Sequence, residues 1–192
     1  MEKYISYKEL LLDYQDEKIP YTKLLSTNEW RLFRDAIVNR DNHTCRICNA
    51  IETERIGKFY IRKPTEEENL TSIQKHSFLI KDNSLIAPKY AVKTGIIDNN
   101  PTILHAHHSY YIHNQLPWEY DKDSIITVCQ NCHYNIHQTS IIPTYKDISK
   151  TDTLKLTPCE KCYGTGYIEK YFYYENGVCF SCMGNRFIEY CQ

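Results

Sequence analysis

The first part of the chain carries apolar residues at helical spacing. Residues 1–26 are expected to hold one short amphipathic helix, whose apolar face consists of Tyr7, Leu10, Leu11 and Tyr14. A second helix is predicted over 27–39, where a Ser-x-x-Glu capping box starts at Ser26. The apolar face of that helix consists of Trp30, Phe33 and Ile37.

Farther along, the pattern changes to that of strands. Residues 103–112 are apolar, aromatic and rich in histidine, and the β-branched run 124–128 should return beside them. A helix over 131–139 is expected to follow the second strand. The order of strand, strand and helix predicts a ββα unit, so that the fold class is α+β.

The chain is expected to have four parts, of which residues 1–26 are the first. Residues 49–103 mix charged stretches with prolines and short β-like runs at 58–61 and 77–80, and they are expected to be an insertion with a few strands. That insertion falls within a main domain over 27–142. The polar stretch 143–157 is expected to be a linker, and 158–192 a small C-terminal module.

Composition narrows the class of protein. With 192 residues, of which 42% are hydrophobic and 24% charged, the chain is expected to be globular. The first residues form no apolar leader and no apolar run is long enough to span a bilayer, so we expect a cytoplasmic protein without a membrane partner. In that reducing compartment, paired cysteines indicate metal ligands rather than disulfides.

Eight of the nine cysteines form four Cys-x-x-Cys pairs. Two such pairs close one tetrahedral zinc site, so the chain is expected to bind two structural zinc ions. Disulfides and an iron–sulfur cluster are the alternatives. The first predicted site consists of Cys45, Cys48, Cys129 and Cys132, and the second of Cys159, Cys162, Cys179 and Cys182. Cys191 remains outside both sites.

The second site lies in an internal repeat with a period of twenty residues. The motif that begins at Cys159 and reaches Gly164 recurs from Cys179 to Gly184, so two similar half-sites should share one metal in a pseudo-twofold ribbon. Glycines at 164, 166 and 184 suit the tight turns whose amides bond the cysteine sulfurs.

A set of histidines lies among these cysteines. His133 and His137 are four residues apart on the predicted helix, so both imidazoles can bind one metal, and His107 from the preceding strand can complete the set. Three imidazoles leave coordination positions open, as a catalytic metal requires. His108 is then available as a general base.

Strand geometry leaves one question open. Neighbouring residues on a strand point to opposite faces, so His107 and His108 converge only if the strand bends, and His105 is a rival ligand. A structural polar cluster is the alternative to a catalytic site. His43, His76 and His113 are expected to be surface residues.

Charge gives little support to long-range attraction of nucleic acid, because the net charge is −1. Local basic residues could follow a phosphate backbone or simply form a solvated face. They are Arg31, Arg34, Arg40, Arg46, Arg55, Lys58, Arg62 and Lys63.

The motifs together resemble the zinc-knuckle form of the HNH endonucleases over roughly residues 28–140. The resemblance implies a ββα-metal fold that cleaves DNA and leaves 5′-phosphate and 3′-hydroxyl ends. His108 would activate water, and the catalytic metal ligands would be His107, His133 and, as in some members, His137. The usual asparagine of the family is replaced by Ser124, preceded by Asp123, and Asn114 is a possible substitute.

The C-terminal repeat resembles the Cys-x-x-Cys-x-Gly-x-Gly zinc-binding repeats of DnaJ-type chaperones. Its second copy has Arg186 in place of the last glycine. The resemblance implies recognition of a protein partner or nucleic acid, and a purely structural role is the alternative.

The sequence thus predicts a metal-dependent HNH endonuclease with DNA as substrate, two structural zinc ions and one catalytic divalent metal. An all-imidazole site prefers Mn, Co, Ni or Zn over Mg. The rival functions are a non-catalytic zinc adaptor that docks a partner or nucleic acid, and an RNase or partner-activated effector nuclease.

Overall fold

Two units make up the chain, and each is described by itself. The computed structural model describes residues 4–15, 17–56, 59–63, 66, 96–171 and 174–191. The first unit combines Met1–Ile51 with Leu104–Gln192, and the second is Glu52–Ile103. Helices and small sheets occur together, so the protein belongs to the α+β class. No helix in the described ranges has both the length and the apolar character to cross a bilayer.

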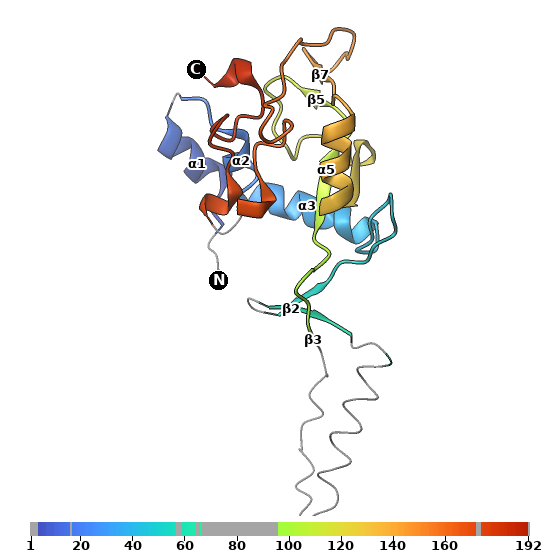
Figure 1. Ribbon diagram of the computed structural model, residues 1–192. Coiled ribbons are helices and arrows are strands. Elements are labelled where there is room, and N and C mark those ends of the chain that lie inside the picture. Colours follow the sequence, from blue (N-terminus) through green and yellow to red (C-terminus); the bar gives the residue numbers. More distant parts are fainter. Residues whose placement is uncertain are drawn as a thin grey trace, which may run out of the picture. The chain divides into compact units, whose positions relative to one another are not determined.

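The first unit begins with two short helices, α1 (Tyr7–Tyr14) and α2 (Tyr21–Leu24), drawn in blue in Figure 1. The single amphipathic helix predicted near the N-terminus is α1. A capping box starts it, because the Ser6 hydroxyl accepts from the Glu9 amide at 3.2 Å and the Glu9 carboxylate accepts from the Ser6 amide at 2.7 Å.

Helix α3 (Asn28–Arg40) lies within one residue of the predicted bounds, but its cap differs from the prediction. Thr27, not Ser26, is the N-cap, and its hydroxyl accepts from the Trp30 amide at 3.3 Å. The reason is tertiary, since Thr27 is extended and bridges to Ile5. The Glu29 carboxylate therefore does not take part in the expected capping box. It accepts a hydrogen bond from the Tyr7 amide at 2.9 Å and so joins α1 to α3.

The predicted ββα unit is present. Strands β4 (Leu104–His108) and β6 (Ile125–Cys129) pair antiparallel, with Leu104 opposite Cys129 and His108 opposite Ile125. Helix α5 (Gln130–Thr139) follows directly. Both α3 and α5 pack on this pair of strands. The buried apolar residues around it are Trp30, Ile37, Val38, Leu104, Ala106, Ile125 and Val128.

The single strand predicted over 103–112 is two strands. After His108 the chain leaves β6, and β5 (Tyr111–Ile112) pairs parallel with β7 (Thr144–Tyr145). The stretch expected to be a linker, 143–157, therefore contains β7. Its backbone is further held by the bond from the Leu154 amide to the Thr144 carbonyl, at 2.7 Å.

The C-terminal module, which we name the ribbon (residues 158–191), has the pseudo-twofold arrangement that its repeat predicts. The Cys159 amide donates to the Arg186 carbonyl, and the Cys179 amide donates to the Gly166 carbonyl, both at 2.9 Å. These are equivalent positions of the two copies. Short 3₁₀ turns complete the ribbon at Glu169–Tyr171, Glu175–Gly177 and Ile188–Tyr190.

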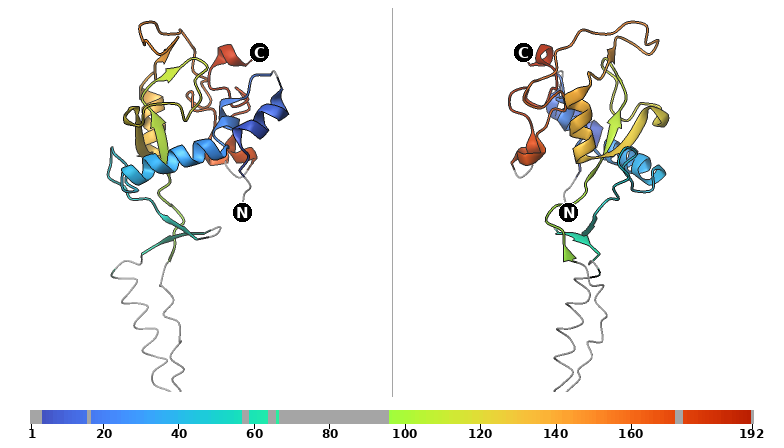
Figure 2. Two further views of the ribbon diagram at one scale, coloured as in Figure 1. Left: turned by 180° about the vertical axis from the view of Figure 1, so that it is seen from behind. Right: turned by 45° about the vertical axis from the view of Figure 1, so that its right-hand side comes forward.

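In the left view of Figure 2 the ribbon lies between the N-terminal helices and α5. Gly184 is in close contact with Thr22 of α2, whose hydroxyl would collide with any Cβ at position 184. The backbone of Gly184 is also left-handed, with φ at 77°. Both constraints require glycine at this position.

The second unit contains a three-stranded antiparallel sheet in the order β1-β2-β3. Its strands are β1 (Glu54–Ile56), β2 (Phe59–Arg62) and β3 (Ile96–Ile97). The predicted β-like run at 58–61 overlaps β2. The other predicted run, 77–80, lies outside the described residues.

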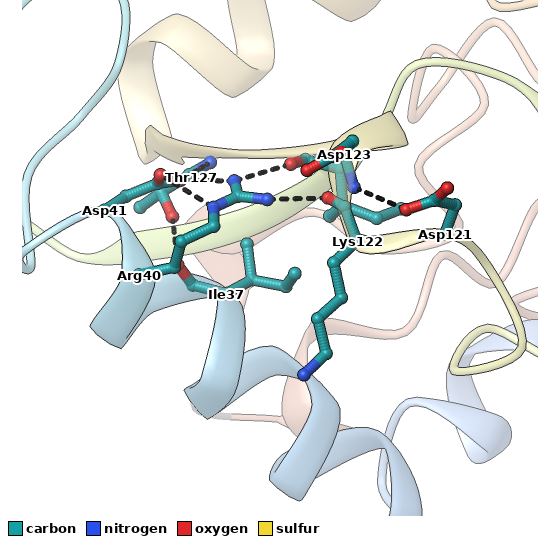
Figure 3. Close-up of polar contacts among 8 residues, drawn as sticks. Ile37, Arg40, Asp41, Asp121, Lys122, Asp123 and Thr127 are labelled. Carbon is teal, nitrogen blue, oxygen red and sulfur yellow. Dashed lines mark hydrogen bonds and ion pairs between the residues drawn. The ribbon is translucent and has the colours of Figure 1, made fainter.

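A polar network joins the end of α3 to β6 (Figure 3). The Asp41 carboxylate accepts two bonds from the Arg40 guanidinium, at 3.0 and 2.8 Å, and one from the Thr127 amide at 3.1 Å. Arg40 also donates to the Lys122 and Ile125 carbonyls. Burial would raise the pKa of Asp41, but the hydrogen bonds from Arg40 and Thr127 outweigh it and lower that pKa.

Replacing Asp41 by Asn should destabilise the fold by about 1–3 kcal/mol, because the buried Thr127 amide and the Arg40 guanidinium lose a charged acceptor. Urea unfolding measures this free energy. The matched control is Asp35→Asn, which breaks the neighbouring Arg34–Asp35 pair, where both side chains are solvent-accessible. That change should cost less than about 1 kcal/mol.

The cost of Asp41→Asn should also depend on pH. The folded pKa of Asp41 is lower than the ordinary value of 3.8, so its stabilisation is complete above that value and is lost as the pH falls through the folded pKa. The difference between wild type and variant should therefore be constant from neutral pH to mild acid and shrink below it. A difference that grows on acidification would contradict this assignment.

Candidate metal centre

Four cysteines from three segments meet at the junction of α3, β6 and α5. Cys45 and Cys48 follow α3, Cys129 ends β6, and Cys132 lies in the first turn of α5. Their ligand atoms all lie within 4.8 Å of one another. The sulfurs of Cys48 and Cys129 are 3.6 Å apart.

The ribbon brings together the second group of four, Cys159, Cys162, Cys179 and Cys182. The sulfurs of Cys159 and Cys179 are 3.9 Å apart, and those of Cys162 and Cys182 are 3.7 Å apart. Zn–S bonds of about 2.3 Å in a tetrahedron place the sulfurs about 3.8 Å apart, whereas a disulfide requires about 2.05 Å. The cysteines are free, and the two predicted groups are confirmed as sites that fit zinc.

Backbone amides around the sulfurs favour the thiolate form that zinc needs. Burial opposes ionisation of Cys45, but hydrogen bonds from the backbones of Cys48, Cys129 and Ile47 lower its pKa to about 6. In the ribbon, the Gly166 amide donates to the Cys162 sulfur at 3.3 Å and lowers its pKa, but the hydrogen bond with the Cys182 thiol and burial outweigh this amide and raise that pKa overall. Such bonds surround the sulfurs of zinc knuckles.

A third cluster consists of His107, His133 and His137, and we name it the histidine triad. Their ligand atoms also lie within 4.8 Å of one another. His107 projects from β4, and the other two come from successive turns of α5. The ring centroid of His107 is 5.3 Å from that of His133 and 5.2 Å from that of His137.

The hydrogen bonds of the triad leave nitrogens for a metal. Nδ1 of His137 donates to the Tyr163 carbonyl at 3.2 Å, and Nδ1 of His133 is 3.2 Å from the Tyr167 hydroxyl, so Nε2 remains as the ligand atom of each. His107 Nδ1 is buried with no hydrogen-bond partner within the described part of the chain. A metal would satisfy this nitrogen, so the triad fits a metal site.

Burial also sets the protonation of the triad. It lowers the pKa of His107 to about 4 and of His137 to about 3, and it lowers the pKa of His133 well below its usual value. All three rings are then neutral at pH 7. The neutral imidazole is the form that binds metals.

His105, the rival ligand, lies beside the triad rather than in it. Its ring stacks on His133 with centroids 5.1 Å apart, and its Nδ1 is 3.1 Å from the Tyr167 hydroxyl. Tyr167 thus connects His105 and His133. A hydrogen bond of this kind fixes the tautomer and ring orientation of a metal ligand.

His108 lies on the opposite face of β4, as strand alternation requires. Its ring stacks on Trp30 of α3 at 5.5 Å between centroids, and its Nε2 donates to the Pro117 carbonyl at 2.9 Å. It is 2% exposed, and burial lowers its pKa to about 3. The structure therefore separates the expected base from the three expected ligands by the thickness of one strand.

The other residues considered in the sequence are exposed, hold the framework together or lie outside the described residues. The Ser124 hydroxyl donates to the Asp121 carbonyl, and the Ser124 carbonyl accepts from the Ser109 amide at 3.0 Å, so backbone contacts brace the loop after β4. Asn114 and Asp123 are exposed, as are His43 and His113. Both Arg34 and Arg40 donate to backbone carbonyls, which makes them part of the framework. His76 and Lys58 lie outside the described residues.

The prediction missed three residues of the ribbon that surround the triad. Tyr163 and Tyr167 orient two of its rings, and Arg186 lies nearby with its guanidinium buried. A cavity of about 310 Å³ opens beside His133 between α5 and the ribbon, and two lysines, Lys161 and Lys170, line it. In the sequence, Tyr167–Ile168 recurs as Phe187–Ile188 after the second cysteine motif of the repeat, but nothing there indicated that Tyr167 meets a histidine.

Comparisons with family models, curated proteins and solved structures give no match for this chain. Any inference about its function therefore rests on the chemistry of the three clusters.

The purified protein should retain two zinc ions per chain and bind a third divalent ion in the triad. His137→Ala should abolish binding of the third ion and leave the two zinc ions in place, because the cysteine groups do not share this ligand. Native mass spectrometry with added Co²⁺ counts the ions. His113→Ala, at an exposed histidine, is the control and should keep all three, whereas a third ion retained by His137→Ala would rule out the triad.

Tyr167→Phe should weaken the third ion about 10- to 100-fold, because His133 loses the hydroxyl that orients it. Competition with a metal-binding dye measures the affinity. Tyr163→Phe is the matched control, since His137 contacts the backbone carbonyl of Tyr163 and not its hydroxyl. Equal affinities of the two variants would show that the Tyr167 hydroxyl does not support the site.

Proposed function

We propose that the protein is a metal-dependent phosphodiesterase that cleaves DNA in the manner of the HNH endonucleases that its motifs resemble. One observation supports this proposal above the others. Three neutral imidazoles, one from the first strand and two from the helix of a ββα unit, converge beside four cysteines that fit zinc.

The donor set is typical of a catalytic metal rather than a structural one. Three protein ligands leave at least one coordination position open, whereas each four-cysteine group is closed. Held by the histidine triad, a metal would act as a Lewis acid and would stabilise negative charge on the phosphate and on the leaving 3′ oxygen. Imidazole ligands favour Mn²⁺, Co²⁺, Ni²⁺ or Zn²⁺ over Mg²⁺.

His108 is the proposed base. Its Nε2 is occupied by the Pro117 carbonyl, so Nδ1 is the nitrogen that would take a proton, and burial keeps the ring neutral. Water loses a proton to Nδ1, its oxygen bonds to phosphorus, and the bond from phosphorus to the 3′ oxygen breaks. The 3′ oxygen takes a proton from solvent, which leaves 5′-phosphate and 3′-hydroxyl ends.

A non-catalytic zinc adaptor is the second candidate, and one observation favours it. His108 is enclosed by Trp30, Tyr111 and Tyr120, with the Tyr120 ring centroid at 4.7 Å. Such packing is what a structural histidine would have. In this case the triad would hold a structural ion and the ribbon would bind a partner.

The nuclease proposal is tested with supercoiled plasmid. Wild type should nick the plasmid when Mn²⁺, Co²⁺ or Ni²⁺ is added and should be inactive in EDTA. His108→Ala and His137→Ala should each reduce the rate at least about 100-fold, through loss of the base and of a ligand respectively. Two retained zinc ions show that each variant is folded.

Single-stranded DNA and RNA, assayed in parallel, separate DNA cleavage from an RNase. Cleavage of RNA alone would replace the DNA proposal with an RNase. Equal nicking by wild type and both variants would contradict the assigned residues, and metal binding without cleavage of any substrate would favour the adaptor.

A further inference from the structure

Arg186 occupies the position that is glycine in the first copy of the repeat. Its counterpart in the first copy, Gly166, has φ at 85°, and Arg186 keeps that left-handed conformation with φ at 75°. A residue with a side chain pays about 1–3 kcal/mol for such a backbone, and it persists where other contacts or a function favour it.

The guanidinium of Arg186 is buried against aromatic rings. It lies 3.5 Å from the ring centroid of Tyr111, 4.4 Å from that of Tyr21 and 5.0 Å from that of Phe187, and the residue is 5% exposed. Cation–π contacts of this kind stabilise a desolvated cation in part. Its Nε donates to the Gly164 carbonyl at 2.9 Å.

No anion balances this charge within the described part of the chain. No carboxylate there lies within salt-bridge distance of Arg186, and its two terminal nitrogens make no hydrogen bond to a described residue. A largely buried cation without a hydrogen-bonded anion is unfavourable, so this environment favours the binding of an anion.

Neighbouring residues connect Arg186 to both parts of the proposed active site, the histidine triad and His108. Consecutive carbonyls of one turn accept from the two groups, Tyr163 from His137 Nδ1 and Gly164 from Arg186 Nε. On its other side, the Tyr111 ring that Arg186 stacks on has its centroid 5.3 Å from that of His108.

The electrostatics agree with this placement. A fixed positive charge beside a metal site repels protons from the histidines and attracts an anionic substrate.

We propose that Arg186 binds a non-bridging phosphate oxygen of the substrate beside the histidine triad. The inference rests on the proposed phosphodiesterase function of the triad. Two terminal N–H groups of a guanidinium match the geometry of phosphate oxygens. The ribbon is then part of the active site and supplies a residue that contacts substrate.

The anion site is tested without catalysis. In zinc-loaded protein labelled with ¹⁵N-arginine, the Nε–H signal of Arg186 is the one absent from Arg186→Lys. Titration with inorganic phosphate should shift this signal saturably, while the same ionic strength of chloride should not. A signal that phosphate leaves in place would overturn the proposal.

Kinetics then test the role in cleavage. Arg186→Gly restores the residue of the first copy, and relief of the left-handed strain should offset the lost ring contacts, so its melting temperature should stay within a few degrees of wild type. Its kcat/KM should fall about 100- to 1000-fold, with KM raised, and Arg186→Lys should recover part of the loss. The triad should still bind its metal in both variants.

The matched control is Lys18→Met, which removes another cation stacked on a ribbon ring, 3.0 Å from the Tyr190 centroid. Its kcat/KM should stay within twofold of wild type. An unchanged kcat/KM in Arg186→Gly would overturn the proposal. A wild type that cleaves nothing would contradict the phosphodiesterase, yet the phosphate titration would still decide whether Arg186 binds an anion.

Discussion

Side-chain alternation along β4 is the constraint on which the rest of the structure depends. Five residues pair with β6, and every second one faces α5 while the others face α3. His105 and His107 consequently meet the histidines of α5, and His108 meets Trp30 of α3. The face that carries the histidine triad and the aromatic core are thus two sides of the same short strand, so a shift in strand register would change both.

Much of this arrangement follows from local rules and could be predicted. Cys-x-x-Cys spacing, the four-residue interval between His133 and His137, and the β-branched run of β6 each fix geometry over a few residues. The cap at Thr27 was misplaced because a bridge to Ile5, over twenty residues away, determines it. The break between β4 and β5 was missed for the same reason, since the partner of β5 is the distant β7.

The surroundings of the triad could not be predicted, because they depend on how the ribbon packs. Tyr167 and Arg186 are separated from His133 by 34 and 53 residues, and no spacing rule relates them. The substitution of glycine by Arg186 was visible as a departure from the repeat. Its role could be inferred only from the structure, in which the guanidinium is buried beside the triad and lacks a carboxylate partner among the described residues.

The contacts between the ribbon and the triad have a thermodynamic consequence. The Tyr163 carbonyl that orients His137 lies one residue beyond Cys162, which belongs to the second four-cysteine group. If zinc in the ribbon favours the turn that holds His137, linkage requires that an ion in the triad tighten the ribbon's hold on zinc by the same free energy. The two metal sites would then act as a cooperative pair, and the availability of zinc would regulate the chemistry of a neighbouring ion.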